Sequence, residues 1–90
     1  MLNEDFNKIL EDFDFIDEWE DKYRYIIDLG KKLDNMKADL KIDANKVNGC
    51  ASQVWISYEK KEKNGDESIF FSGDSDAMIV KGLIAIVFSL

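Results

Sequence analysis

The sequence has no histidine, no proline and only one cysteine, Cys50. Without histidine it lacks the side chain that most often serves as a general base near neutral pH and as a metal ligand. Serine–histidine and cysteine–histidine catalytic pairs are therefore excluded, and we expect no metal site. A lone cysteine cannot form an internal disulfide and lacks the CxxC spacing of zinc or dithiol redox sites. We therefore expect the protein to work in a reducing, cytoplasmic setting.

Basic residues are also scarce, because 12 lysines and arginines stand against 19 acidic residues and give a net charge of −7. This charge repels phosphate backbones and anionic lipid surfaces, so we expect neither nucleic acid nor a membrane as a partner. The acidic N-terminus lacks the basic start and apolar run of a signal peptide. The most apolar stretch, residues 77–90, is interrupted by Lys81 and is shorter than the roughly 20 residues of a membrane span.

Apolar residues at helical spacing predict two helices at the start of the chain, which pack on each other. The first is expected to end near Phe13, and its apolar face consists of Leu2, Phe6, Ile9, Leu10 and Phe13. Asn3 and two acidic residues favour its start. The second is expected to use Asp17 as its N-cap and to end near Gly30. Its apolar face consists of Trp19, Tyr23, Ile26, Ile27 and Leu33.

The apolar period is lost over residues 34–49, which predict an irregular connection leading to Cys50. The spacing of apolar residues then changes to every second residue, which is typical of a strand. We expect a β-hairpin built from residues 53–61 and 67–72, with Asn64-Gly65 in a type I′ turn. The stretch from Gly73 to Asp76 closes the second strand and offers caps for a final helix that begins around Ala77. The predicted class is α+β: two N-terminal helices, a β-hairpin and a C-terminal apolar helix.

Three segments, in this order, resemble the SufE family of sulfur acceptors. Residues 19–30 are similar to the family's second helix, and residues 48–56, NGCASQVWI, to its active-site loop and first strand. Residues 73–84, GDSDAMIVKGLI, are similar to its third motif. Family members commonly have proline where this chain has Asn48. Asparagine tolerates left-handed turn geometry, so the turn itself can persist without it.

Length is the second difference from the family. Members usually continue with further helices beyond the point that matches Leu90. The resemblance therefore implies a single SufE-like domain over residues 1–90 that is incomplete at its C-terminus. A helix that is apolar on nearly every face is normally buried on all sides. Without further helices, we expect residues 77–90 to stay partly uncovered and the chain to form a homodimer through them.

The resemblance also implies a function centred on Cys50. The family cysteine takes sulfur from the persulfide of a cysteine desulfurase, a pyridoxal phosphate enzyme, and supplies iron–sulfur cluster assembly. The chain would then be an accessory protein with no cofactor of its own, and its partners would be a desulfurase and a downstream Fe–S scaffold. The candidate loop and partner-binding residues are Gly49, Ser52, Gln53, Asp74 and Asp76. For Asp74, Ser75 and Asp76 the sequence favours capping of the final helix over a role in docking.

The residues beside Cys50 favour presentation of its thiol. Gly49 allows unusual backbone angles and the close approach of another molecule, and the cysteine lies where a loop meets a strand. Free thiols are mostly protonated at pH 7, and the nearest lysine in the sequence is Lys46, so we expect the partner enzyme to help activate the thiol. Two other functions stay open: a desulfurase-binding regulator or fragment that does not transfer sulfur, and a one-cysteine redox sensor.

Overall fold

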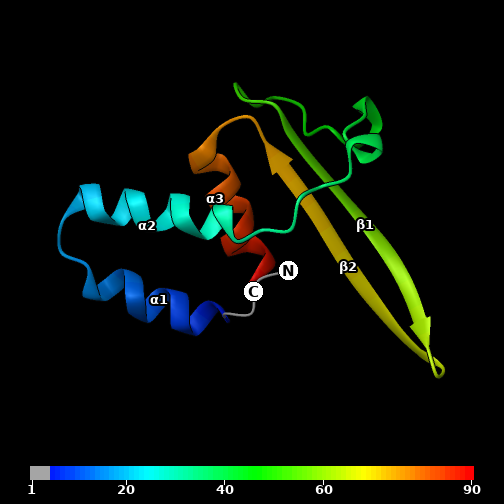
Figure 1. The fold of residues 1–90 in the computed structure, drawn as a ribbon, viewed down its shortest axis with the longest axis horizontal. Coiled ribbons are helices and arrows are strands. Elements are labelled where there is room, and N and C mark those ends of the chain that lie inside the picture. Colours follow the sequence, from blue (N-terminus) through cyan, green and yellow to red (C-terminus); the bar gives the residue numbers. More distant parts are fainter. Residues whose placement is uncertain (1–4) are drawn as a thin grey trace.

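The computed structural model describes residues 5–90 and confirms the predicted α+β arrangement (Figure 1). Two antiparallel strands form the only sheet of the described residues, and three helices lie at one end of it. The elements are α1 (Phe6–Phe15), α2 (Trp19–Lys31), β1 (Val54–Lys63), β2 (Asp66–Ser75) and α3 (Met78–Phe88). The connection from α2 to β1 is irregular, as predicted, apart from two short 3-10 turns, Ala38–Leu40 and Asp43–Asn45.

Helix α1 is capped by Asp5, whose side chain accepts a hydrogen bond from the Lys8 amide at 2.8 Å. Leu2 and Asn3, which the sequence assigns to this helix, lie outside the described residues. The helix continues to Phe15, two residues beyond its predicted end. The hydroxyl group of Tyr25 on α2 donates to Asp12 of α1 at 3.1 Å, which joins the two helices.

Helix α2 differs from its prediction at its first turn. Its N-cap is Glu18 and not Asp17, and the Glu18 side chain makes no capping hydrogen bond. Trp19 and Tyr23 were expected on the packed face, but 76% and 53% of their surfaces are exposed. The end of the helix provides its buried side chain, Leu29, because only this end reaches α3 and the sheet.

The β-hairpin is longer than predicted and closes through the expected turn. Asn64 and Gly65 have φ angles of 55° and 84°, the left-handed values that a type I′ turn requires at both central residues. The ladder runs from Lys63 opposite Asp66 to Val54 opposite Ser75. Strand β2 therefore extends beyond its prediction at both ends, whereas β1 begins one residue later than predicted and ends two residues later. Because residues directly opposite share a face, the register creates one apolar face. It consists of Val54, Ile56, Tyr58, Ile69, Phe71 and Gly73.

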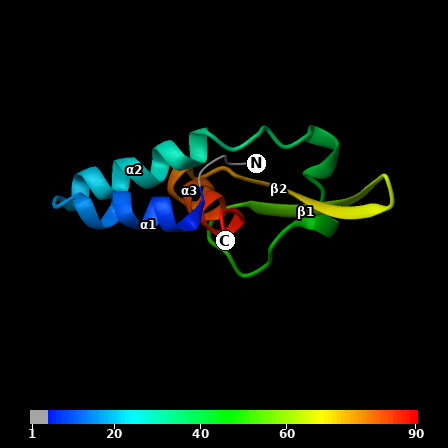
Figure 2. The same cartoon turned by 90° about the horizontal axis from the view of Figure 1, so that it is seen from below.

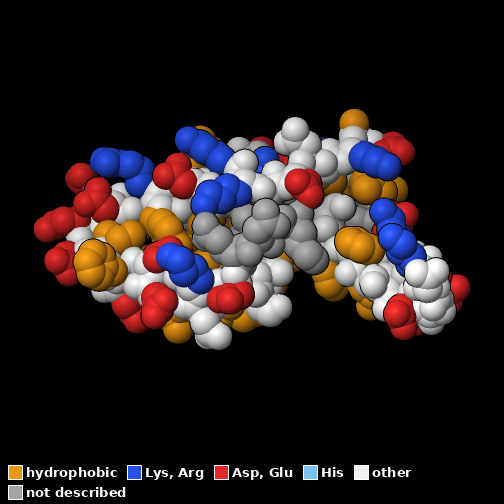
Figure 3. All heavy atoms as spheres, turned by 60° about the horizontal axis from the view of Figure 1, so that its bottom comes forward, with side chains coloured by type: hydrophobic (Ala, Val, Ile, Leu, Met, Phe, Trp, Pro, Cys, Tyr) orange, Lys and Arg blue, Asp and Glu red, His pale blue; other side chains and the backbone are white. Residues whose placement is uncertain are grey.

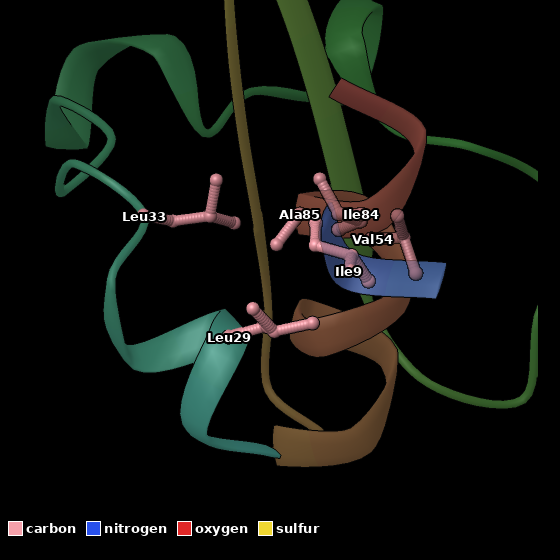
Figure 4. Packing of buried hydrophobic residues seen from close by; sticks show 6 residues of the cluster. All are labelled: Ile9, Leu29, Leu33, Val54, Ile84 and Ala85. Carbon is pink, nitrogen blue, oxygen red and sulfur yellow. The ribbon is translucent and has the colours of Figure 1, made fainter. Parts of the chain in front are cut away.

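Helix α3 covers only one end of that apolar face. A Cβ placed on Gly73 would lie 2.9 Å from Ile84 and 3.1 Å from Phe88, so the helix contacts the strand directly. The core gathers at this point, with side chains from all three helical segments and from β1 (Figure 4). Its buried residues are Ile9, Leu29, Leu33, Val54, Ile84 and Ala85.

The rest of the hairpin projects away from the helices (Figures 1 and 2). The radius of gyration is 14.4 Å, whereas a compact chain of this length would have one of about 12 Å. Every described residue from Glu59 to Phe71 is exposed. Leu83 and Val87 on α3 and Leu90 after its end are exposed as well, as expected for a segment that the rest of the chain covers only in part.

Acidic side chains gather around the end of the molecule where α1 turns into α2, with hydrophobic side chains among them (Figure 3). Phe15 and Trp19 lie here and are 88% and 76% exposed. The Nζ atom of Lys22 lies 4.7 Å from the centre of the Phe13 ring and 5.1 Å from that of Trp19. This end of the molecule is therefore both acidic and aromatic.

Candidate functional site

Cys50 is a free, exposed thiol in the loop formed by residues 48–53. The loop lies at the end of the hairpin opposite its turn, beside the connection from β2 to α3 (Figure 1). Its first side is fixed to β1, because the Val47 amide donates to the Val54 carbonyl oxygen at 2.8 Å and Lys46 forms a β-bridge with Trp55. Hydrogen bonds to the sheet therefore close the base of the loop and leave its thiol outside.

Gly49 gives the loop its tight turn immediately before the cysteine. Its φ angle is +85°, a left-handed value that other residues adopt only with strain, and no heavy atom lies within 4 Å of a Cβ built there. The unusual backbone angle expected from the sequence is thus present. Space around the residue is open, so its requirement for glycine comes from the backbone conformation and not from crowding.

Gln53 and Asp76 close the second side of the loop. The Gln53 amide donates to Asp76 Oδ1 at 3.0 Å, and the Asp76 amide donates to the Gln53 carbonyl oxygen at 3.2 Å. The second bond joins backbone groups one position beyond the last ladder pair, Val54 and Ser75, and the first adds the Asp76 side chain to it. The structure therefore brings Asp76 to the loop, where it engages the backbone of Gln53. Ser52 lies in the same loop and is partly exposed.

The carboxylate of Asp74 binds two lysines. Its carboxylate forms ion pairs with Lys41, from the α2–β1 connection, and with Lys81 of α3 at 3.6 Å. It also accepts the Ser75 amide at 2.8 Å. Partial burial alone would raise the pKa of Asp74, but the Lys41 and Ser75 hydrogen bonds and the two lysine charges outweigh it. The pKa therefore lies below its ordinary value of 3.8.

The interpretation of Asp74 and Asp76 as helix caps is wrong. The N-cap of α3 is Ala77, and no side chain makes a capping hydrogen bond to this helix start. Asp74 and Ser75 pair with β1 in the ladder. Only two residues then lie between the strand and α3, too few for a separate capping turn. Ser75 Oγ instead accepts the Ala77 amide at 3.2 Å, which shapes the turn from strand to helix.

Lys41 belongs to this region but was not identified from the sequence. It lies in a segment without apolar periodicity and shares no recognisable spacing with Asp74, so no local signal marks the pair. Its Nζ atom also lies 5.8 Å from the centre of the Trp55 ring. Trp55 is opposite Asp74 in the ladder and is partly buried.

Fold and site together define a small α+β protein that presents one thiol on a loop held at both sides. Within residues 5–90 no group of three or more histidine, cysteine, aspartate or glutamate side chains could hold a metal ion. In the same part of the chain, every helix is too short or too polar to traverse a lipid bilayer.

Comparison with known proteins identifies the family. Residues 7–90 match SufE, the Fe-S metabolism associated domain. An uncharacterised SufE-like protein of Rhizobium meliloti (strain 1021) is 49% identical over 84 residues, which cover 93% of this chain and 60% of that protein. Another, from Rhizobium etli, is 48% identical over 81 residues, which cover 90% of this chain and 55% of that protein.

The chain therefore belongs to the SufE family, whose domain is associated with iron–sulfur metabolism. It spans between about half and two thirds of the length of these curated relatives. The matched region contains the whole thiol loop together with the strands and the helix that position it.

Proposed function

We propose that this chain is a sulfur acceptor, in which Cys50 takes sulfur from a cysteine desulfurase and carries it toward iron–sulfur cluster assembly. The observation that carries the proposal is the free, exposed thiol on a loop whose two sides are hydrogen-bonded to the sheet. Membership of the SufE family supports the same chemistry. The chain acts as an accessory protein and needs no cofactor of its own, since the desulfurase brings pyridoxal phosphate.

The transfer is a thiol exchange. The Cys50 thiolate attacks the outer sulfur of a cysteine persulfide on the desulfurase, a new S–S bond forms at Cys50, and the S–S bond on the enzyme breaks. The enzyme's cysteine leaves as a thiolate, and Cys50 ends as a persulfide. One S–S bond replaces another, so the step needs no external oxidant or reductant.

The geometry suits a docked transfer because the thiol has to reach a cysteine on another protein. Cys50 is exposed, and Gly49 provides the turn before it without a side chain that would obstruct an approaching surface. The hydrogen bonds at Val47 and Gln53 keep the two sides of the loop in place, which lowers the entropy lost on docking.

The composition of the chain supports a carrier role. Cys50 is the only cysteine, so no second thiol in the chain can attack the persulfide and release its sulfur early. No basic residue is adjacent to Cys50 in the sequence. We therefore assign part of the thiol activation to the desulfurase, which also releases its sulfur faster when the acceptor is bound. A reducing cytoplasm keeps such a thiol free.

Mass spectrometry of the chain after incubation with a desulfurase and free cysteine tests this function. A gain of one sulfur atom on Cys50 is expected, and Cys50→Ser should prevent it while leaving the fold unchanged, because a hydroxyl is similar in size but far less nucleophilic. Unmodified protein that still binds the desulfurase would show a regulator instead. Oxygen adducts formed with peroxide alone, without sulfur acceptance, would indicate a redox sensor.

A further inference from the structure

Asp74 connects three segments of the chain through its carboxylate. The residue itself lies on β2, Lys81 approaches it from α3 at 3.6 Å, and Lys41 approaches it from the α2–β1 connection. The side chains of Asp74, Lys41 and Lys81 are 15%, 34% and 25% exposed. Ion pairs that are shielded to this extent are screened less by solvent than fully exposed pairs.

Lys41 contacts Trp55, the neighbour of Val54, whose carbonyl oxygen accepts the hydrogen bond that closes the Cys50 loop. Its ammonium group is above the Trp55 ring, at 5.8 Å from the ring centre. The backbone of Trp55 forms the β-bridge with Lys46, and the next residue, Val47, donates the closing hydrogen bond to Val54. One side chain therefore contacts both strands of the hairpin where the connection turns into the loop.

From this arrangement we infer that Lys41 is a positioning residue for Cys50. By binding Asp74 and the face of Trp55, it fixes the end of the connection against the hairpin and stabilises the Val47–Val54 hydrogen bond at the base of the loop. The importance of this role for sulfur transfer rests on the function proposed above. The effect on the loop is a property of the chain alone.

Lys81 provides a matched control inside the same ion-pair group. It binds the same carboxylate and is similarly shielded, but it belongs to α3 and not to the segment that leads to Cys50. Loss of either lysine leaves Asp74 with the other, so neither substitution buries an uncompensated charge. If the ion pairs served only global stability, each substitution would change exchange at Val47 in proportion to its effect on the melting temperature, whereas a positioning role gives the Lys41 substitution an excess effect at the loop.

Amide hydrogen exchange followed by NMR, together with thermal unfolding, separates these cases. Lys41→Met should accelerate exchange of the Val47 amide by roughly three- to tenfold, because local opening of the closing bond becomes easier. Lys81→Met should change it by less than about twofold, although both variants lower the melting temperature, Lys41→Met the more because it also removes a hydrogen bond to Asp74. Lys41→Arg keeps the charge and should restore slow exchange. Equal effects of the two methionine variants at Val47, or none, would overturn the inference.

Lys41→Gln keeps a hydrogen-bond donor without the charge and provides the measurement if Lys41→Met does not fold. Loss of folding in both Lys41 variants, with Lys81→Met folded, would show a structural residue and refute the positioning role. With a desulfurase present, Lys41→Met should raise the KM for the acceptor more than it changes kcat. If the wild-type chain accepts no sulfur, the proposed function fails while the exchange result stands. Unchanged exchange at Val47 in the Lys41→Met variant would refute the positioning role but not the proposed function.

Discussion

Gly30 of α2 and Gly82 of α3 lie at the point where their two helices cross. A Cβ built on Gly30 would be 2.7 Å from the Gly82 nitrogen, and one built on Gly82 would be 2.1 Å from the Ile26 carbonyl oxygen. These distances are shorter than any real contact of a Cβ atom, so the two backbones touch without side chains between them. Both residues belong to segments that resemble the SufE family, and the structure explains them by packing.

Gly82→Ala should therefore destabilise the fold strongly. The added methyl group meets backbone atoms of α2, which cannot rotate away as a side chain would, so we expect a loss near or above the upper end of the usual 1–3 kcal/mol of overpacking. Thermal unfolding followed by circular dichroism measures it. Gly49→Ala is the control, since nothing surrounds that site and only its φ of +85° opposes the substitution, at a cost of about 1 kcal/mol. Equal losses in the two variants would contradict the close crossing.

Asp76→Ala should loosen the second side of the Cys50 loop. The substitution removes the acceptor of the Gln53 amide but leaves the bond from the Asp76 amide to Gln53 intact. We expect faster hydrogen exchange at Gln53 and a loss of about 1 kcal/mol in the free energy of unfolding. Asp76→Asn keeps an acceptor oxygen and should preserve most of the protection. Unchanged exchange in the alanine variant would mean that this bond does not order the loop.

Asp74 makes stability depend on pH in acid. Its pKa is lower in the folded protein than its ordinary value of 3.8, so the ionised group stabilises the fold at neutral pH. This contribution disappears as the pH falls below about 4 and passes through the folded pKa. Melting temperatures of wild type and Asp74→Asn should therefore differ at pH 7 and converge toward pH 2. A constant difference over this range would show that the ion pairs contribute nothing.

An exposed apolar stripe along α3 and past its end should make the chain dimerise. It consists of Leu83, Val87 and Leu90. Ile56, Phe71, Val87, Phe88 and Leu90 line a largely apolar groove of about 260 Å³, which joins the stripe to the apolar face of the hairpin. Covering a few hundred Å² of such surface favours association by several kcal/mol, at about 25 cal/mol per Å² and before the entropic cost. Light scattering at micromolar concentration should give a dimer mass.

Val87→Lys tests the dimer, because Val87 is 58% exposed and its substitution should return the mass to that of a monomer. Asn7→Lys, on the exposed surface of α1, adds the same charge and should leave the dimer intact. Phe88→Lys is less suitable, since Phe88 packs on Phe71 with 5.6 Å between ring centres and contacts Gly73. A wild-type monomer would refute the prediction.

Much of the fold could be predicted because its signals are local. The turn at Asn64 and Gly65 requires two positive φ angles, and few residue pairs other than this one supply them readily. The packed face of α2 could not be predicted in the same way. Trp19 lies on the apolar face that the spacing predicts and Leu29 does not, yet Leu29 is the one that packs in the core, because burial depends on where the helices cross.

The candidate site also has one part that local sequence signals predict and another that depends on tertiary structure. Gly49 and Cys50 are adjacent in sequence, and their neighbours alone indicated a turn that presents a thiol. The contact between Gln53 and Asp76 joins residues 23 positions apart, and the pair of Lys41 and Asp74 depends on the path of an irregular connection. Such contacts arise from tertiary structure, which is why the aspartates were misinterpreted as caps and the lysine was missed.

Side chains alternate between the two faces of the hairpin, so the register of β1 against β2 decides which of them face α3. A shift of one residue between β1 and β2 would move Ile56 and Tyr58 to the opposite side of the ribbon and turn Trp55 toward α3. Trp55 would then leave Lys41, and Gln53 would no longer face Asp76. The Asn64-Gly65 turn excludes this shift from the far end of the hairpin, so a two-residue turn sets the alignment on which the thiol loop at the opposite end depends.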